Sequence, residues 1–258
     1  MTAAGTRVEL IGIPGLPLVR AGDDLAGLIA AAIDRAGLAP ATGDVLVVAQ
    51  KIVSKAEDRA VDLTTVEPSA RAQTIGAETA KDPRLVEVIL GESRRVVRQR
   101  PNVLITEHRL GYVMANAGVD HSNVAPADGN ERVLLLPVDP DGSADRLRQK
   151  LSARYGCDIA VIINDSFGRP WRRGTAGVAL GAAGLPSVLD LRGRPDLFGR
   201  ALQVSLVGFA DEIAAAASLV MGQAAEAMPA VLVRGLVWSE APSPAQTLVR
   251  VPEEDLFR

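Results

Sequence analysis

Two short apolar segments, residues 44–49 and 158–164, constrain the fold of this chain more than any other feature. Between their polar ends they contain only Val, Leu, Ile and Ala, without the alternation that marks a strand with one face in water. Strands of this kind are buried on both faces, which requires helices above and below the sheet. The two segments therefore predict an α/β protein built around a buried sheet.

Helices and further strands are expected around these segments. Asp23 and Asp24 cap an Ala- and Leu-rich helix that stops near Gly37. Further helices are expected over residues 69–90, with an interruption at Asp82-Pro83, over 143–155 and over 211–220. Additional strands are expected over residues 7–13, 94–99, 102–106, 111–115, 133–138, 188–191, 202–209 and 229–234. No linker divides the 258 residues, so we predict one domain with mixed sheets in two interleaved subdomains.

Charge and composition argue against several classes of partner. A formal net charge of -3 gives no electrostatic reason to expect a nucleic-acid partner, which would call for an excess of Lys and Arg. No apolar run approaches the roughly 20 residues of a membrane helix, and no signal peptide follows Met1. The single cysteine, Cys157, excludes an internal disulfide and fits a reducing cytoplasm. We therefore expect a cytoplasmic protein.

The familiar signatures of nucleotide and catalytic sites are missing from the sequence. It contains no G-x-x-x-x-G-K-[ST] phosphate loop, no G-x-G-x-x-G fingerprint after a strand, no H-E-x-x-H and no serine nucleophile elbow. Its two histidines, His108 and His121, lack metal-ligand spacing. If this protein binds a nucleotide, it does so with a phosphate-binding segment other than these motifs.

Two aspartates are the strongest candidates for metal ligands. Asp165 follows the second apolar segment and precedes Ser166, and ligands of α/β proteins gather beyond the carboxyl ends of strands. A carboxylate and a hydroxyl are the hard oxygen ligands that Mg²⁺ and Mn²⁺ prefer. Asp120 lies in the polar, turn-forming segment 118–131 and could share a metal with Asp165. The alternative is that both aspartates only stabilise turns or cap helices.

Two basic clusters are candidates for binding phosphates or carboxylates. The chain has only four lysines, and Lys51 and Lys55 lie within five positions of each other. A compact ammonium can meet a phosphate as a point charge, although both lysines could equally be solvated at the end of a strand. Arg169, Arg172 and Arg173 surround a tryptophan and could hold an anionic substrate, or form a solvated turn.

Four segments of the chain occur in the same order in one known family. These are residues 13–17 (IPGLP), 47–55 (VVAQKIVSK), 118–123 (GVDHSN) and 165–172 (DSFGRPWR). In these segments the chain resembles the coenzyme F420-0:L-glutamate ligases. The resemblance extends from about residue 9 to about residue 234. Each segment alone would be weak support, and their shared order makes the resemblance specific.

The resemblance implies the family's fold and a GTP-dependent ligase that joins L-glutamate to the carboxylate of coenzyme F420-0 and then adds further γ-linked glutamates. It implies that Asp120 and Asp165 bind one divalent metal, Mg²⁺ or Mn²⁺, and that Ser166 and Gln223 bind a second. Lys55 would act in catalysis with these aspartates. The positions that match the family's GTP site are Leu16, Pro17, Leu18, Val19, Gln50, Lys55, Asn123, Met221, Gly222 and Gln223. It also implies a homodimer, and it leaves open whether K⁺ assists.

Three departures from the family pattern limit what the resemblance carries over. Ser166 stands where relatives often have Thr, which keeps the hydroxyl, and Gln50 replaces a Ser or Thr of some members. Residues 174–177 read GTAG where other branches have GQTD, in a region that could touch substrate. A related amide ligase with a different acid or amino acid, and a non-catalytic GTP-binding protein, are therefore the alternatives.

Overall fold

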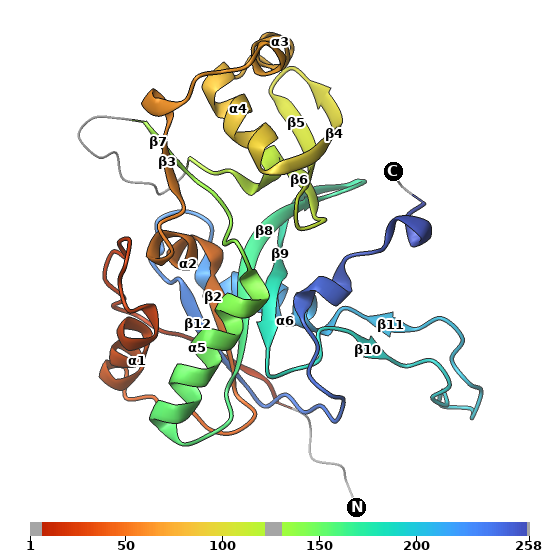
Figure 1. Ribbon diagram of the computed structural model, residues 1–258. Helices are drawn as coiled ribbons and strands as arrows, with labels where there is room; N and C mark the ends of the chain where they lie inside the picture. Colours follow the sequence, from red (N-terminus) through yellow and green to blue (C-terminus); the bar gives the residue numbers. More distant parts are fainter. Residues whose placement is uncertain (1–6, 122–130, 257–258) are drawn as a thin grey trace, which may run out of the picture.

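A five-stranded mixed sheet forms the centre of the molecule (Figure 1). The structure is a computed structural model that describes residues 7–121 and 131–256. In spatial order the strands are β1 (Glu9–Gly12), β12 (Ala230–Arg234), β2 (Val45–Ala49), β8 (Ala160–Arg169) and β9 (Arg172–Ala183). β2 and β8 run parallel and the other neighbours run antiparallel. The two apolar segments thus pair at the centre, and the predicted α/β fold with mixed sheets is confirmed.

Helices cover both faces of this sheet. α1 (Leu25–Arg35), α2 (Gln50–Ala56) and α5 (Pro140–Tyr155) pack on one face, and α6 (Phe209–Met221) packs on the other (Figure 1). Along β2, Leu46 and Val48 join the first core, while Val45 and Val47 join the core beneath α6. Each face is apolar because successive side chains of a strand point in opposite directions.

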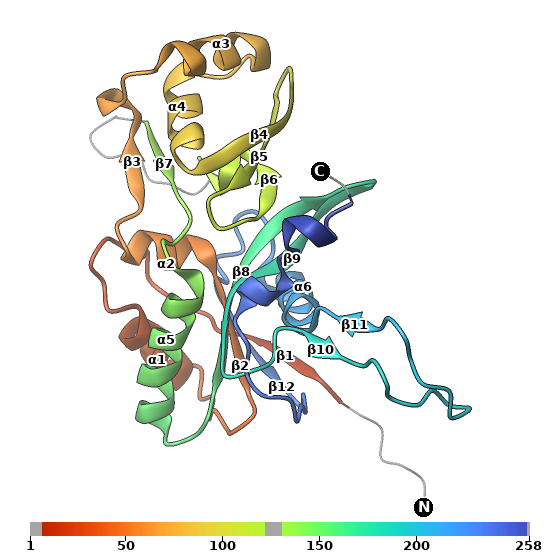
Figure 2. The ribbon, with the colours of Figure 1, turned by 45° about the vertical axis from the view of Figure 1, so that its right-hand side comes forward.

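The chain between α2 and α5 forms a smaller lobe with its own apolar core (Figures 1 and 2). Its helices and strands are β3 (Ala60–Asp62), α3 (Ala70–Thr79), α4 (Pro83–Gly91), β4 (Ser93–Arg100), β5 (Val103–His108), β6 (Val113–Ala115) and β7 (Arg132–Leu134). The predicted meander and the predicted break at Asp82, which caps α4, are confirmed. The expected strand over 133–138 is shorter, because β7 ends at Leu134. The division of the chain into two interleaved subdomains stays a prediction.

The strand after residue 158 does not end where the sequence suggested. β8 continues through Asp165 and Ser166 to Arg169, and β9 returns from Arg172 as a long antiparallel partner. The prediction that Asp165 follows the end of a strand is therefore wrong. Asp165 instead lies in β8 at the level where the neighbouring β2 has already ended, since Ala49 pairs with Asn164.

β9 was not expected because Gly and Ala dominate its sequence and have low β-propensity. The structure explains why these residues are small. A Cβ atom on Gly177 would lie 2.2 Å from the Oγ of Ser218 on α6, and one on Gly181 would lie 2.2 Å from the carbonyl oxygen of Pro140 on α5. Both helices approach β9 so closely that only glycine fits at these two positions.

Two further expectations need correction. The strand expected over residues 202–209 is reduced to β11 (Leu206–Val207), which pairs with β10 (Leu189–Asp190), and Phe209 already belongs to α6. β10, β11 and the loop between them form an arm that projects from the body (Figure 2). The lysine pair does not lie at the end of a strand, because residues 50–56 form α2.

Short 3₁₀ helices complete the described part of the chain, at Leu63–Thr65, Asn116–Gly118, Ala245–Leu248 and Pro252–Glu254. Across residues 7–121 and 131–256, no helix combines the length and the apolar character needed to cross a membrane.

Candidate functional site

The topology of the central sheet brings distant segments together at one edge. β1 and β2 both end at this edge, and β12 begins there, because β12 lies antiparallel between them. Backbone hydrogen bonds fix the three ends: Ile13 donates to Ala230 and Ala49 donates to Pro229, at 2.9 and 2.8 Å. The loops that follow β1 and β2 and precede β12 therefore surround a common space.

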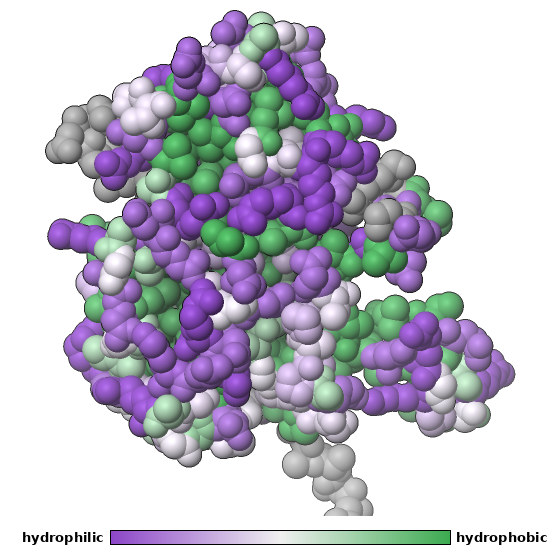
Figure 3. Space-filling model, in the orientation of Figure 1, coloured by the Kyte–Doolittle hydropathy of each residue, from purple (hydrophilic) through white to green (hydrophobic). Residues whose placement is uncertain are grey.

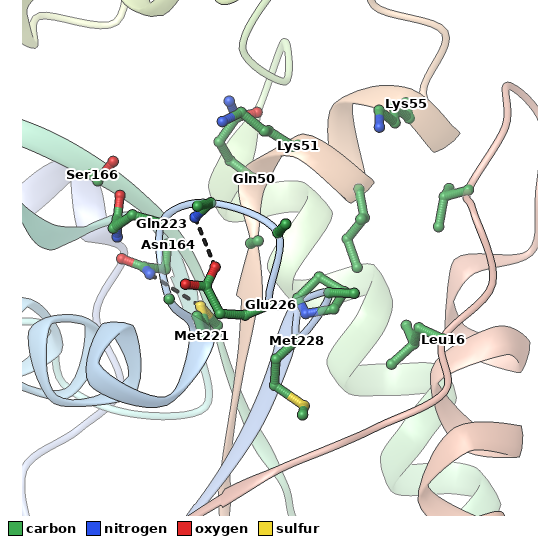
Figure 4. Close-up of a pocket in the computed structure, with 18 of the residues that line it drawn as sticks. Leu16, Gln50, Lys51, Lys55, Asn164, Ser166, Met221, Gln223, Glu226 and Met228 are labelled. Atoms are coloured by element: carbon green, nitrogen blue, oxygen red, sulfur yellow. Dashed lines mark hydrogen bonds between the residues drawn. The ribbon is translucent and has the colours of Figure 1, made fainter. Parts of the chain in front are cut away.

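A pocket of about 400 Å³ occupies this space (Figure 4). The loop after β1, the start of α2, the middle of β8 and the segment from α6 to β12 provide its walls. The lining residues are Leu16, Pro17, Leu18, Val19, Ala49, Gln50, Lys51, Ile52, Lys55, Asn164, Asp165, Ser166 and residues 221–229. The structure therefore brings together eleven of the site residues predicted from the sequence: Leu16, Pro17, Leu18, Val19, Gln50, Lys55, Asp165, Ser166, Met221, Gly222 and Gln223.

The segment after α6 forms a tight loop on one side of the pocket. Gly222 ends α6 with a φ of 70° and a ψ of -175°, a conformation that other residues rarely adopt. A Cβ atom at this position would lie 2.2 Å from the side chain of Glu226. The Glu226 carboxylate folds back over Gly222 and accepts a hydrogen bond of 2.7 Å from the backbone N–H of Ala224 (Figure 4). Gly222 therefore ends α6 and sets the shape of this wall.

Acidic and basic side chains meet on the β8 side of the pocket. Lys51 forms an ion pair with Asp120, with 2.7 Å between Nζ and Oδ2. Burial raises the pKa of Asp165 to about 6, while the backbone N–H of Ser166 and the Lys51 ammonium act to lower it and the Asp120 charge raises it further. Asp120 does not line the pocket, but it acts electrostatically on Asp165 and pairs with a lysine of the pocket wall. The predicted pair of aspartates thus belongs to one electrostatic cluster.

The alternation of β8 divides the polar groups between two faces of the sheet. Ile163 and Phe167 pack into the core beneath α1 and α5, so Asp165, between them, points to the same face. Asn164 and Ser166 point to the α6 face, where Asn164 donates a 3.0 Å hydrogen bond from Nδ2 to the Oγ of Ser218. From β8, the site thus receives a carboxylate on one face of the sheet and an amide and a hydroxyl on the other.

This donor set fits divalent metal ions on both sides. Two neighbouring carboxylates repel each other, as the effect of Asp120 on the pKa of Asp165 indicates, and a cation held between them would relieve that repulsion. On the α6 face, Ser166 and Gln223 present a hydroxyl and an amide, which are hard oxygen ligands. No group of three or more His, Cys, Asp or Glu side chains that could hold a metal occurs among the described residues.

Lys55 and Gln50 line the pocket from α2. Burial, followed by repulsion from Lys51, lowers the pKa of Lys55. Gln50 is almost fully buried and its Oε1 accepts a 2.8 Å hydrogen bond from the Oγ of Ser54, so its amide is held at the pocket wall by its own helix. Lys55 can place a positive charge on an anion bound in the pocket.

Some predicted site residues lie elsewhere. Arg169, Arg172 and Arg173 flank the turn of the β8–β9 hairpin, away from the pocket lining, and Trp171 at its tip has a left-handed backbone and is 81% exposed. Asn123 lies outside the described residues.

Sequence reasoning missed two polar residues that line the pocket, Asn164 and Glu226. Lys51, named with Lys55 as a candidate for binding phosphate, lines it as well. The position of Asn164, immediately before Asp165 at the end of an apolar run, was an available signal for it.

Known proteins are similar to this chain over nearly its whole length. The model of the F420-0:gamma-glutamyl ligase family matches residues 15–235. The chain is 48% identical over 253 residues to the coenzyme F420:L-glutamate ligase of Methanothermobacter thermautotrophicus, which covers 97% of this chain and 99% of the relative. It is 48% identical over 244 residues to that of Methanopyrus kandleri, covering 93% of each chain. It is also 42% identical over 252 residues to that of Archaeoglobus fulgidus, covering 98% of this chain and 97% of the relative. This chain belongs to the coenzyme F420-0:gamma-glutamyl ligase family.

Proposed function

We propose that this chain is a GTP-dependent ligase that joins the amine of L-glutamate to the carboxylate of coenzyme F420-0 and then adds further γ-linked glutamates. Membership of the family and the names of its relatives support a ligase that adds glutamate to coenzyme F420-0. The observation that supports dependence on GTP and metal is the pocket, which is lined by Lys55, Asp165 and Ser166 and by the loop that follows α6 at Gly222.

The reaction divides into two balanced steps. The carboxylate of the acceptor attacks the γ-phosphorus of GTP, the bond between that phosphorus and the β,γ-bridging oxygen breaks, and GDP leaves. The resulting acyl phosphate is then attacked at its carbonyl carbon by the amine of glutamate. The carbon–oxygen bond to phosphate breaks, the amide forms, and the amine gives up protons to solvent. The sum is one amide, one GDP and one phosphate.

The residues of this chain serve the first step through position and charge. Lys55, whose ammonium is partly desolvated, offsets the negative charge of the triphosphate and of the leaving GDP. The apolar side chains of Leu16 and Ile52, together with the Met221–Met228 segment, offer a surface for the nucleotide. Because these groups are fixed by the sheet edge and by the loop closed at Gly222, little reorganisation is needed on binding.

Divalent metal would be held by Asp120 and Asp165 on one side of β8 and by Ser166 and Gln223 on the other. Bound Mg²⁺ or Mn²⁺ supplies neutralisation of the phosphate oxygens as charge moves onto GDP. Lys51 forms an ion pair with Asp120, and both residues act electrostatically on Asp165. Arg169, Arg172 and Arg173 remain our candidates for binding an anionic acceptor, although they lie at the turn of the β8–β9 hairpin and do not line the pocket.

A homodimer is part of the same proposal. The β10–β11 arm carries strongly exposed apolar side chains, Leu197, Phe198 and Val204, at 99, 85 and 84% exposure. Hydrophobic residues are visible along the β11 side of the arm (Figure 3). Such a surface favours burial against a second copy. We expect Phe198→Asp to convert the dimer to a monomer in light scattering coupled to gel filtration. Val138→Asp, at an exposed apolar residue between β7 and α5 and outside the arm, should leave the dimer unchanged.

The experiment that tests the function is turnover by the purified full chain. Coenzyme F420-0, L-glutamate, GTP and Mn²⁺ are supplied with and without K⁺, and product mass and GDP release are followed. A mass increase of one or more glutamyl units that requires GTP and metal is the expected result. GTP binding without either product would refute the ligase reaction, and exchange of L-glutamate for other amino acids tests the amine substrate.

A further inference from the structure

The side chain of Asn164 has an unexplained polar atom at the pocket. Asn164 is only 6% exposed and lines the pocket between β8 and the end of α6. Its Nδ2 donates to the Oγ of Ser218 at 3.0 Å and to the Sδ of Met221 at 3.4 Å. Its Oδ1 is buried and has no hydrogen-bond partner in the described structure. A buried carbonyl oxygen without a partner is costly, so its retention requires a reason.

The neighbours of this amide favour one orientation. The hydroxyl of Ser218 donates its hydrogen to the carbonyl oxygen of Ala214, at 3.0 Å. With that hydrogen engaged, Ser218 accepts the hydrogen bond from Asn164, which places Nδ2 toward α6. Oδ1 must then point away from α6.

Two other side chains that carry oxygen ligands line the pocket on the same side as Asn164. Asn164 and Ser166 lie two residues apart on β8 and project from the same face of the sheet. Their side-chain oxygens can approach within the roughly 3 to 4 Å that separates adjacent oxygen ligands of one small cation. Gln223 reaches the same side of the pocket from the loop after α6 (Figure 4).

We propose that Oδ1 of Asn164 is a further oxygen ligand of the cation held by Ser166 and Gln223 on the α6 face of β8. This inference rests on the proposed function, since that function supplies the cation. The three proposed ligand atoms, a hydroxyl and two amide oxygens, carry no charge, and the nearby Glu226 carboxylate accepts a hydrogen bond from the backbone N–H of Ala224. The charge of the cation is therefore balanced mainly by the phosphates of the nucleotide. Binding of this cation consequently depends on the nucleotide, unlike binding at the carboxylate pair of Asp120 and Asp165.

The test is Mn²⁺ binding to the full chain, measured from the paramagnetic resonance signal of free Mn²⁺ with and without GDP. For wild type we expect one site without GDP and a second with it. Asn164→Ala should weaken the second site tenfold or more. Asn164→Asp, which replaces the orphan oxygen with a charged one, should tighten it by a similar factor. Ser218→Ala removes the partner of Nδ2 but leaves Oδ1, and should change the affinity less than threefold.

Several results would overturn the proposal. If wild type shows no second Mn²⁺ site with GDP, Oδ1 has no cation to bind. If the affinity of that site is the same in wild type and in both Asn164 variants, Oδ1 is not a ligand. Weakening of equal size in Ser218→Ala, or weakening in Asn164→Asp, would show that Asn164 acts only by packing. If Asn164→Ala does not fold, the effect of Asn164→Asp on the Mn²⁺ affinity of the second site tests the proposal alone: tighter binding supports it, and weaker binding refutes it. Failure of wild type to turn over F420-0 would instead refute the proposed function. The turnover assay uses wild type alone, so the two failures can be distinguished.

Discussion

The substitution Gly181→Ala should destabilise the protein strongly although it adds a single methyl group. The new Cβ atom would lie 2.2 Å from the carbonyl oxygen of Pro140 and 2.9 Å from the backbone nitrogen of Asp141. Both contacts are with backbone, so no side chain can turn aside. The first turn of α5 must therefore retreat from β9 by about 1 Å to restore ordinary van der Waals contact.

That retreat also costs hydrogen bonds. The Asp141 carboxylate accepts from the backbone N–H groups of Ala182 and Ala245 at 2.8 and 2.7 Å, and it would move with the helix. Overpacking costs about 1 to 3 kcal/mol and a weakened hydrogen bond to a charged group about 1.5 to 3 kcal/mol. We expect a loss of about 3 to 5 kcal/mol in the free energy of unfolding, which corresponds to a fall in Tm of roughly 10 °C.

Thermal unfolding followed by far-ultraviolet circular dichroism measures this effect. Gly168→Ala is the matched control, because it lies on the same hairpin, has a negative φ and meets nothing within 4 Å. Its stability should stay within about 0.5 kcal/mol of wild type. Equal Tm values for the two variants would refute the conclusion that close approach of α5 selects glycine at position 181.

Three further results are expected from the charged groups. Asp165→Asn should abolish Mn²⁺ binding but stabilise the metal-free protein at pH 8 by at most about 3 kcal/mol, because burial raises the pKa of Asp165 to about 6. This gain in stability should vanish as the pH falls toward 4, where Asp165 is protonated in the wild type. A gain that does not change with pH would contradict the prediction. Burial acts to raise the pKa of Glu92, but the hydrogen bond from His108 and the charges of Arg109 and Arg59 outweigh it and lower the pKa to about 2; the Nη2 of Arg59 lies 3.1 Å from Oε2 of Glu92. Glu92→Gln should therefore lower the free energy of unfolding by about 3 kcal/mol at pH 7 in denaturant titrations. This loss should shrink between pH 4.5 and 2, and an equal loss at pH 2 would refute the prediction. Lys55→Met should raise the Kd for GDP about tenfold or more in calorimetry, whereas Lys81→Met, outside the pocket, should leave it unchanged; similar values for both would exclude a nucleotide contact for Lys55.

The elements that the sequence predicts well are those whose own composition determines them. The apolar runs of β2 and β8 and the cap at Asp82 carry local signals, and all three were found. β9 carries the opposite local signal, because Gly177 and Gly181 were selected by the helices that pack against them. Information of that kind lies in residues more than 30 positions away and cannot be read from a window of sequence.

The site was predictable only in part for a similar reason. Asp165 and Ser166 could be selected by their position after an apolar run, although the strand itself continues past them. The role of Asn164 becomes visible only when the hydrogen bonds of Ser218, 54 residues later, are known. The convergence of loops from β1, β2 and β12 depends on strand order, which alternation of side chains does not encode.

The strand order also has a consequence for how the molecule assembles. β12, the last strand of the sheet, lies between β1 and β2, the first two, and it is the strand with which β1 pairs. During synthesis β1 and β2 emerge first, and the gap between them stays open until the final strand arrives. Pairing over more than 180 positions is slow because the intervening chain must first be ordered. The pocket wall that precedes β12 is completed in the same event, so nucleotide binding during refolding should report the closing step.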